Sequence, residues 1–329
     1  MQDIDVIIKE KYGLDVGAVL PYRDAYIINT PKGKKCLKST RLSEGRILFI
    51  DSVKEHLYKN GFQSIDRYVN TLDGKPYVNI DNQYYILSDY VEGRECDFNN
   101  SDDVSKAARL LASMHKASRG YVSPKGCEPR DYLGKLPYYF QKRLNELKRI
   151  KKRAAKGKSK FDYLVTQYID YFYEIGEKVI RNLMDSNYFK LVEQSRQSGQ
   201  ICHHDFTHTN IICGRNSMSV INFEYCCYEL KVYDMANFLR RKMRKCNWKL
   251  DEAAVILKEY GNIESISRDE FVILKLMIEF PQKFWRIVNK YYNNRRSWAE
   301  KSNLDNLNDV IREIDYMSEF MKHFDELMM

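Results

Sequence analysis

The chain has 329 residues and a net charge of +9, is 44% hydrophobic and 13% aromatic, and has only 7 prolines and 15 glycines. These values predict a packed globular protein with two unequal lobes, or one large domain with insertions, and they exclude extended disorder. Residues 1–20 lack a signal-peptide pattern and no apolar run reaches the roughly 18 residues that cross a bilayer, so we expect a protein made in the cytoplasm without a membrane partner.

The first part of the chain, residues 1–90, is predicted to form a small lobe of β-strands with one helix. Apolar runs flanked by Pro, Gly and Asn turns predict the strands, and apolar residues at helical spacing predict the helix. Ser43 is the expected N-cap of this helix. The predicted elements are a hairpin of strands 25–30 and 35–38, a helix over 42–60, strands at 77–80 and 84–87, and a link over 88–93.

The second part, residues 91–329, is predicted to be mainly helical. Its predicted helices span 102–116, 137–155 and 161–184, with a loop over 120–134 and further helices from 234 onward that are interrupted near Gly261 and Pro281. A small β-rich N-lobe followed by a link and a larger helical C-lobe predicts the α+β, bilobal, protein-kinase-like fold. A nucleotide would lie in the cleft between the lobes.

The positive charge is concentrated between Gln141 and Lys160, where ten Lys or Arg residues accompany the single acid Glu146. Such a patch attracts phosphate groups, nucleic acid or an acidic polymer. No aromatic stacking platform interleaves the run, so a solvated helix face is the favoured interpretation. We do not expect nucleic acid to be a partner.

Two neighbouring stretches carry the chemistry that a kinase needs. Asp205 and Asn210 are separated by four residues, and an apolar strand with Asn222 and Glu224 follows. Phosphoryl transfer needs positioning and neutralisation of negative charge more than covalent help. Asp205 is therefore the candidate catalytic base and Asn210 the candidate magnesium ligand. The alternatives are a loop aspartate that makes local backbone hydrogen bonds and a turn asparagine.

The nucleotide is expected to contact a lysine on the N-lobe and the link between the lobes. Lys38 ends a predicted strand and precedes a helix that can supply a pairing acid, for which Asp51 is preferred over Glu55 because it lies nearer the apolar stripe. The alternative is a solvated lysine at a strand edge. In the link, the predicted cofactor-binding residues are Asp89, Tyr90 and Val91.

The cysteines and histidines show no recognisable metal pattern. The eight cysteines form neither a C-x-x-C pair nor the paired spacing of a zinc site, so we expect reduced, mostly buried thiols. Cys202, His203, His204 and His208 leave a zinc cluster or a Cys–His nucleophile as alternatives. Adjacent histidines point in divergent directions and H-E-x-x-H spacing is absent, so the kinase-like pattern explains these positions better.

Three short motifs together resemble the catalytic block of the aminoglycoside phosphotransferase and choline kinase superfamily. They are His203-x-Asp205-x-x-x-x-Asn210, then Ile221-Asn222-Phe223-Glu224, and then Tyr233-Asp234-Met235-Ala236. The resemblance implies that Asp205 is the base, that Asn210 and the position of Asn222 bind metal, and that Asp234 helps hold the catalytic loop. The superfamily has an aspartate where this chain has Asn222.

A wider set of stretches resembles the CotS-type spore coat proteins of endospore-forming bacteria. These stretches are 35–62, 85–93, 131–137, 201–212, 232–248, 280–285 and 291–292. The resemblance implies a kinase-like fold, deposition in the spore coat and other spore coat proteins as partners. It implies no assigned substrate.

The departures from the superfamily pattern put phosphoryl transfer in question. Asn222 offers magnesium a neutral oxygen where a carboxylate would add charge attraction, and Glu224 is the candidate replacement ligand. No G-x-G-x-x-G run lies in residues 22–35, so the backbone has fewer N–H groups to bring close to a phosphate. The favoured hypothesis is a degenerate kinase-like scaffold of the spore coat that needs no cofactor.

Two alternatives stay open. The first is an active kinase with ATP and Mg²⁺ as cofactors and a small-molecule hydroxyl substrate. Aromatic residues are concentrated near the C-terminus, at Phe284, Trp285, Tyr291, Tyr292 and Trp298. They are interpreted either as a cage that binds a cationic substrate or as helix packing. The second alternative is a binder of polyanions that uses Lys142–Lys160.

Overall fold

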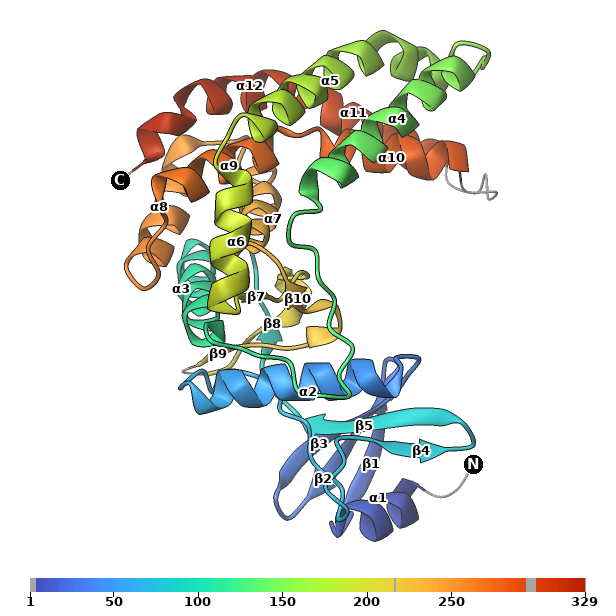
Figure 1. Cartoon of the computed structure of the whole chain (residues 1–329). Coiled ribbons are helices and arrows are strands. Elements are labelled where there is room, and N and C mark those ends of the chain that lie inside the picture. Colours follow the sequence, from blue (N-terminus) through green and yellow to red (C-terminus); the bar gives the residue numbers. More distant parts are fainter. Residues whose placement is uncertain (1–3, 216, 294–299, 329) are drawn as a thin grey trace. The chain divides into compact units, whose positions relative to one another are not determined.

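The structure is a computed structural model that describes residues 4–215, 217–293 and 300–328 (Figure 1). It divides into two compact units. Unit 1 contains the residues up to Asp131 and Ser198–Tyr228, and unit 2 contains Tyr132–Gln197 and the residues from Glu229 onward. The predicted lobe boundary at residue 90 falls inside unit 1.

Unit 1 contains a five-stranded antiparallel sheet with the strand order β1-β2-β3-β5-β4. The strands are β1 (Ala18–Tyr22), β2 (Ala25–Thr30), β3 (Gly33–Thr40), β4 (Val78–Ile80) and β5 (Gln83–Asp89). Both predicted strand pairs are therefore confirmed, whereas β1 was not predicted. The helix α1 (Ile4–Tyr12), also unpredicted, packs Ile8 against Leu37 and Leu87 of the sheet, and all three side chains are buried.

The predicted helix after the hairpin is confirmed as α2 (Glu44–Lys59), and the Ser43 side chain accepts a hydrogen bond from the Arg46 backbone N–H as its N-cap. Ile47 on its apolar face packs against Tyr77 and Ile86 of the sheet region. The helix α3 (Ser101–Ser118) follows, capped by Asn100, and packs against α2. This contact explains why unit 1 extends beyond the predicted N-lobe.

Short elements complete unit 1 and carry the sequence motifs. They are β6 (Arg94–Glu95), β7 (Ile201–Cys202), the 3₁₀ turn η1 (His208–Asn210), β8 (Ile211–Cys213), β9 (Met218–Val220), the 3₁₀ turn η2 (Phe223–Tyr225) and β10 (Cys227–Tyr228). The strands pair as a three-stranded sheet β6-β8-β9 and a two-stranded sheet β7-β10. Asn210 and Asn222 therefore lie just outside the paired ends of β8 and β9.

Unit 2 is built from helices. They are α4 (Leu136–Ala154), α5 (Lys160–Met184), α6 (Tyr188–Ser198), α7 (Val232–Met243), α8 (Leu250–Gly261), α9 (Arg268–Glu279), α10 (Gln282–Asn293), α11 (Glu300–Arg312) and α12 (Ile314–His323), with the 3₁₀ turn η3 (Phe324–Leu327). The predicted helices over 137–155 and 161–184 are confirmed, and α6 was not predicted. Within the described residues, none of the helices has the length and apolar character that a bilayer span requires.

Two residues of the aromatic group near the C-terminus stack on other rings of unit 2. Phe284 stacks on Phe172 at 4.1 Å between ring centres, and Tyr291 stacks on Phe161 at 3.9 Å. Trp298, which was also placed in this group, lies outside the described residues. Each of these two rings has one face covered by its stacking partner, so the packing interpretation is the better one for Phe284 and Tyr291.

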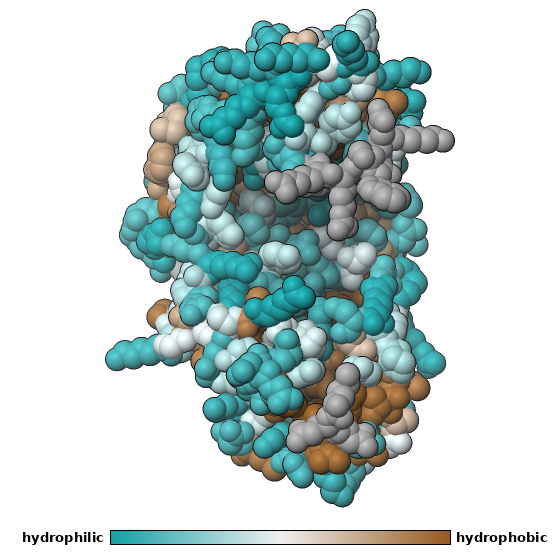
Figure 2. Space-filling view, turned by 90° about the vertical axis from the view of Figure 1, so that its right-hand side faces the viewer, coloured by the Kyte–Doolittle hydropathy of each residue, from teal (hydrophilic) through white to brown (hydrophobic). Residues whose placement is uncertain are grey.

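The basic run lies mostly on α4, whose Leu and Ile side chains are buried and whose lysines are exposed. Figure 2 shows a largely hydrophilic surface over the helices at the top of the view. Some cations of the run are already engaged within unit 2. Lys151 pairs with Asp170 at 2.7 Å, and the Arg143 guanidinium lies 4.8 Å from the Trp285 ring centre.

One glycine is required by a close approach of two backbone segments. Gly93 has a φ of +152°, and a Cβ atom there would lie 2.3 Å from the carbonyl oxygen of Cys213. The two segments are neighbours because Arg94 of β6 pairs with Cys213 of β8. A side chain at position 93 would therefore push β6 away from β8.

We expect Gly93→Ala to lower the free energy of unfolding by about 2 to 4 kcal/mol, from backbone strain plus overpacking. Urea denaturation followed by circular dichroism measures this loss. The matched control is Gly74→Ala, because Gly74 also has a positive φ of +79° but no atom within 4 Å of the added Cβ. Its expected loss is about 1 kcal/mol. Equal losses in the two variants would contradict the steric argument.

Candidate functional site

A buried histidine holds the loop that carries Asp205. His203 follows β7 and is fully buried. Its Nδ1 accepts a hydrogen bond from the Asp205 backbone N–H at 3.2 Å, so in the neutral ring Nε2 carries the proton and donates to the Ile221 carbonyl oxygen at 3.0 Å. His203 thereby joins the two motif segments. Both ring nitrogens of His203 are used in hydrogen bonds that hold these segments together. We therefore interpret His203 as a structural residue and not as a zinc ligand.

Asp205, Asn210 and Asn222 form one chain of side-chain hydrogen bonds. The Asn210 amide Nδ2 donates to the backbone oxygen and to Oδ2 of Asp205, both at 2.9 Å. The Asn222 Nδ2 then donates to Asn210 Oδ1 at 3.3 Å. The structure therefore brings together the candidate base and two of the three candidate metal-ligand positions.

The position of Asn222 depends on its backbone. It has φ 66° and ψ 65°, a left-handed conformation that asparagine tolerates better than most residues. Its backbone N–H points to Asp66 Oδ2 at 3.5 Å. Asp66 was not predicted as a site residue, because it lies in an irregular segment without a motif.

Lys38 lies in the same unit and pairs with Glu224, two residues after Asn222. Its Nζ lies 3.3 Å from Glu224 Oε1 and 3.4 Å from Asp24 Oδ2. Burial lowers the pKa of Lys38, but the attraction of Glu224 and Asp24 outweighs this effect and raises it overall. The ammonium group is therefore charged, and two carboxylates already surround it.

The predicted pairing of Lys38 with Asp51 is wrong, because the acids that pair with Lys38 are Glu224 and Asp24. The helix α2 instead contributes a buried cation, Lys54, which pairs with Asp66 at 3.0 Å. The Lys54 ammonium also lies 4.0 Å from the centre of the Tyr68 ring. Helical spacing alone did not reveal that Glu224 of η2 and Asp24 of the β1–β2 turn would pair with Lys38.

The turn between β1 and β2 lies in the stretch 22–35, where the sequence has no G-x-G-x-x-G run. It consists of two residues, Arg23 and Asp24, between the paired residues Tyr22 and Ala25. Arg23 has a φ of +55° and its guanidinium pairs with Glu95 at 2.8 Å. The turn therefore presents the Asp24 carboxylate beside Lys38.

The remaining predicted site residues have other contacts. The Asp89 side chain pairs with Lys35 across the β3–β5 ladder at 2.5 Å, and the Tyr90 backbone N–H donates to the Lys34 carbonyl oxygen at 3.1 Å. Val91 follows in the link. Asp234 is fully buried on α7 in unit 2. Nucleotide binding by the link and the role of Asp234 at the catalytic loop stay predictions.

Asp51 gives a prediction about stability and pH. Burial, followed by the negative charge of Glu55, raises the pKa of Asp51 from 3.8 to about 6. Since the folded state holds this proton more tightly than the unfolded chain, the carboxyl group costs stability as the pH rises through this interval. We expect Asp51→Asn to raise the free energy of unfolding by about 1 to 3 kcal/mol at pH 8, with the gain disappearing near pH 4.

Urea denaturation at several pH values checks the Asp51 prediction. The control is Asp15→Asn, which removes the same charge from a side chain that is 77% exposed and pairs only with exposed Lys9. A gain for Asp51→Asn that is the same at pH 4 and pH 8 would contradict the electrostatic explanation.

The fold has clear structural relatives. An aminoglycoside phosphotransferase from Alicyclobacillus acidocaldarius aligns with a TM-score of 0.84 and 21% identity, over 94% of this chain and 92% of that chain. The amicoumacin kinase hAmiN aligns with a TM-score of 0.58 and 14% identity, over 100% and 94% of the two chains. At these identities the likeness shows the fold alone, and it confirms the predicted kinase-like fold.

The sequence relatives are spore coat proteins. Spore coat protein S of Bacillus subtilis (strain 168) is 24% identical over 308 residues, which cover 93% of this chain and 88% of the relative. Endospore coat-associated protein YutH of the same organism is 21% identical over 299 residues, covering 88% and 84%. The family described as "Spore coat putative kinase YutH" matches residues 5–324. The chain therefore belongs to this spore coat family of kinase-like proteins.

Proposed function

We propose that this protein is a structural or assembly component of the spore coat that keeps a kinase-like fold and has lost efficient phosphoryl transfer. Its family and its two relatives from Bacillus subtilis support the place in the coat, with other coat proteins as partners. The loss of catalysis is inferred from the site in unit 1. The observation that carries it is the hydrogen bond from Asn222 to Asn210.

When an aspartate stands at the position of Asn222, a metal ion must lie between it and Asn210. Here the hydrogen bond from Asn222 to Asn210 holds the two residues together instead. The backbone oxygen and Oδ2 of Asp205 both accept hydrogen bonds from Asn210. The NH₂ group of Asn210 must therefore point to Asp205, and its Oδ1 points to position 222. A carboxylate at 222 would repel that oxygen unless a cation lay between them. The Asn222 amide donates to it directly, so the two segments are held together without a cation.

The surroundings of Lys38 also disfavour a nucleotide phosphate. One positive charge faces the carboxylates of Asp24 and Glu224, which leaves a net charge of −1 in this group. A phosphate approaching Lys38 would therefore meet repulsion. A like charge at about 4 Å costs roughly 4 kcal/mol at an effective dielectric constant of about 20. Dissociation of Asp24 from Lys38 would reduce this cost, because the Asp24 side chain is 76% exposed.

The second candidate function is an active kinase that uses ATP and Mg²⁺ to phosphorylate the hydroxyl group of a small molecule. It is favoured by one observation: two groups of candidate site residues lie in the same unit. In the first group Lys38 pairs with Glu224, and in the second hydrogen bonds connect Asn222, Asn210 and Asp205. In that case Asn210 and Glu224 would hold the metal and Asp205 would accept the proton of the attacking hydroxyl. Binding of polyanions by the exposed lysines of α4 remains a third, less supported proposal.

Isothermal titration with ATP, with and without Mg²⁺, tests the loss of the phosphate site. We expect no magnesium-dependent binding to the unchanged protein at about 1 mM ATP, the upper end of ordinary substrate affinities. The double variant Asp24→Asn and Asn222→Asp should gain such binding, because it removes one of the two carboxylates beside Lys38 and restores a carboxylate beside Asn210. The control pair Asp15→Asn and Asn222→Asp restores the carboxylate but leaves Asp24 in place.

Turnover of ATP with a panel of small hydroxyl compounds separates the two candidate functions. Tight magnesium-dependent binding by the unchanged protein, lost in Lys38→Ala, together with turnover lost in Asp205→Ala, would overturn the scaffold proposal. If the double variant binds ATP and the unchanged protein does not, the Asp24 carboxylate and the missing carboxylate at position 222 are the cause of the lost ATP binding.

Deposition in the coat is tested by fractionating spores that express a tagged chain. We expect the chain in the coat fraction, and an equal amount of Asp205→Ala, because assembly on the folded surface does not need the candidate base. Gly93→Ala, which weakens the β6–β8 contact, is expected in a smaller amount. Loss of Asp205→Ala from the coat, with its fold intact by circular dichroism, would show that deposition depends on catalysis.

A further inference from the structure

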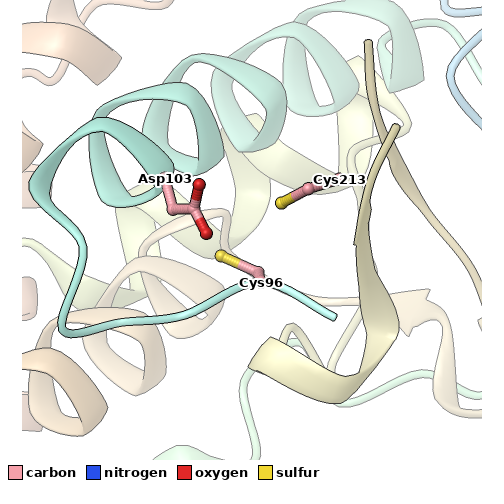
Figure 3. Close-up of side chains that lie close together, drawn as sticks. All are labelled: Cys96, Asp103 and Cys213. Carbon is pink, nitrogen blue, oxygen red and sulfur yellow. The ribbon is translucent and has the colours of Figure 1, made fainter. Parts of the chain in front are cut away.

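Three potential metal ligands from separate elements of unit 1 meet next to the β6–β8 pair. Cys96 follows β6, Asp103 lies in the first turn of α3, and Cys213 ends β8. One ligand atom from each lies within 4.8 Å of the other two. Figure 3 shows the two sulfur atoms and the carboxylate pointing toward a common point.

The three side chains are held in place by their surroundings. Cys96 is 2% exposed and Asp103 is 3% exposed. The Arg94 guanidinium donates to both Asp103 oxygens at 2.6 and 2.8 Å, and the Asp97 backbone N–H donates to Oδ2 at 2.9 Å. Donors that fix a carboxylate from behind are typical of the residues that surround protein metal sites.

The group also has an opening on one side. Cys213 is partly exposed, and it lines a cavity of about 610 Å³ together with Asp103 and Arg94. A water molecule can therefore reach the side of the cluster that protein ligands do not occupy. Three protein ligands with a water in the fourth position is a common arrangement for zinc.

We propose that Cys96, Asp103 and Cys213 bind a thiophilic divalent ion of the zinc class, with a water molecule from the cavity as the fourth ligand. Two thiolates and one carboxylate carry a charge of −3, which a divalent ion and Arg94 neutralise. Without the ion, protonated thiols leave the Asp103–Arg94 pair, which is also neutral. Binding replaces waters of the hydrated ion with two metal–sulfur bonds and one bond to an Asp103 oxygen, and one water stays as the fourth ligand. It releases the displaced waters and the two thiol protons to the solvent without any oxidation or reduction.

The ion would connect segments that the candidate site depends on. β8 begins directly after Asn210, and Cys213 is its last residue. Coordination by Cys213 and Asp103 would therefore fasten the strand after the candidate metal-ligand loop to the first turn of α3. This role is independent of whether the protein transfers phosphate.

The test uses the full chain, reduced, stripped of metal with a chelator and then titrated with Co²⁺ or Zn²⁺ alone. We expect about one ion per chain, thiolate-to-cobalt charge-transfer absorption, and displacement of Co²⁺ by Zn²⁺. Zn²⁺ should also raise Tm. Cys213→Ala should lose the charge-transfer band and at least about 100-fold in affinity, since even supporting residues around metal sites contribute 10 to 100-fold.

Two further variants sharpen the test. Asp103→Asn removes the carboxylate charge and should lower affinity while keeping the sulfur absorption. Cys246→Ala is the matched control, because Cys246 is a partly exposed cysteine of unit 2 and its loss should leave binding unchanged. Cys213 is partly exposed, so its alanine variant is expected to fold, and circular dichroism checks this.

Either of two results would overturn the proposal. The first is a stoichiometry clearly below one ion per chain, or an affinity that is equal in the unchanged protein and in Cys213→Ala. The second is a Cys96–Cys213 disulfide, found by peptide mapping of protein purified without reductant, together with no metal binding after reduction. In that second case the two cysteines would be a redox pair and not metal ligands.

Discussion

The buried His203 side chain is the constraint on which the candidate site depends. It accepts from the Asp205 backbone and donates to the Ile221 carbonyl oxygen, so a single neutral ring spans the segment after β7 and the segment after β9. Both ring nitrogens are used and the residue is fully buried, so losing either bond would leave an unsatisfied polar group inside unit 1. Asp205, Asn210 and Asn222 keep their mutual distances because this ring fixes the backbone on both sides of them.

Local signals were sufficient to predict much of the fold. The hairpin of β2 and β3 was predicted because apolar runs flank a Pro and Gly turn, and α2 because Ser43 caps an apolar face with helical spacing. The helices α1 and α6 and the strand β1 were missed, since they are short or follow no clear periodicity. The kinase-like fold class was predicted from the order of the elements together with the motifs.

The sequence predicted only those residues of the candidate site that belong to recognisable motifs. Asp205, Asn210 and Asn222 are connected by side-chain hydrogen bonds because they lie on adjoining segments, whereas the Glu224 carboxylate pairs with Lys38. The partner of Lys38 was wrong: Glu224 is 186 residues away along the chain, and only the packed structure shows that it is closer than any acid on α2. For the same reason the sequence showed no metal spacing for Cys96 and Cys213, which become neighbours only when β6 pairs with β8.

The amide pair of Asn210 and Asn222 has a consequence for the conditions under which the loop keeps its shape. Amides do not titrate between acid and alkaline pH, and their hydrogen bond needs no dissolved ion. Chelators should therefore leave the hydrogen bond between these two amides intact. An enzyme with an aspartate at the second position would lose the bridging cation under the same treatment, and its two oxygens would then repel each other.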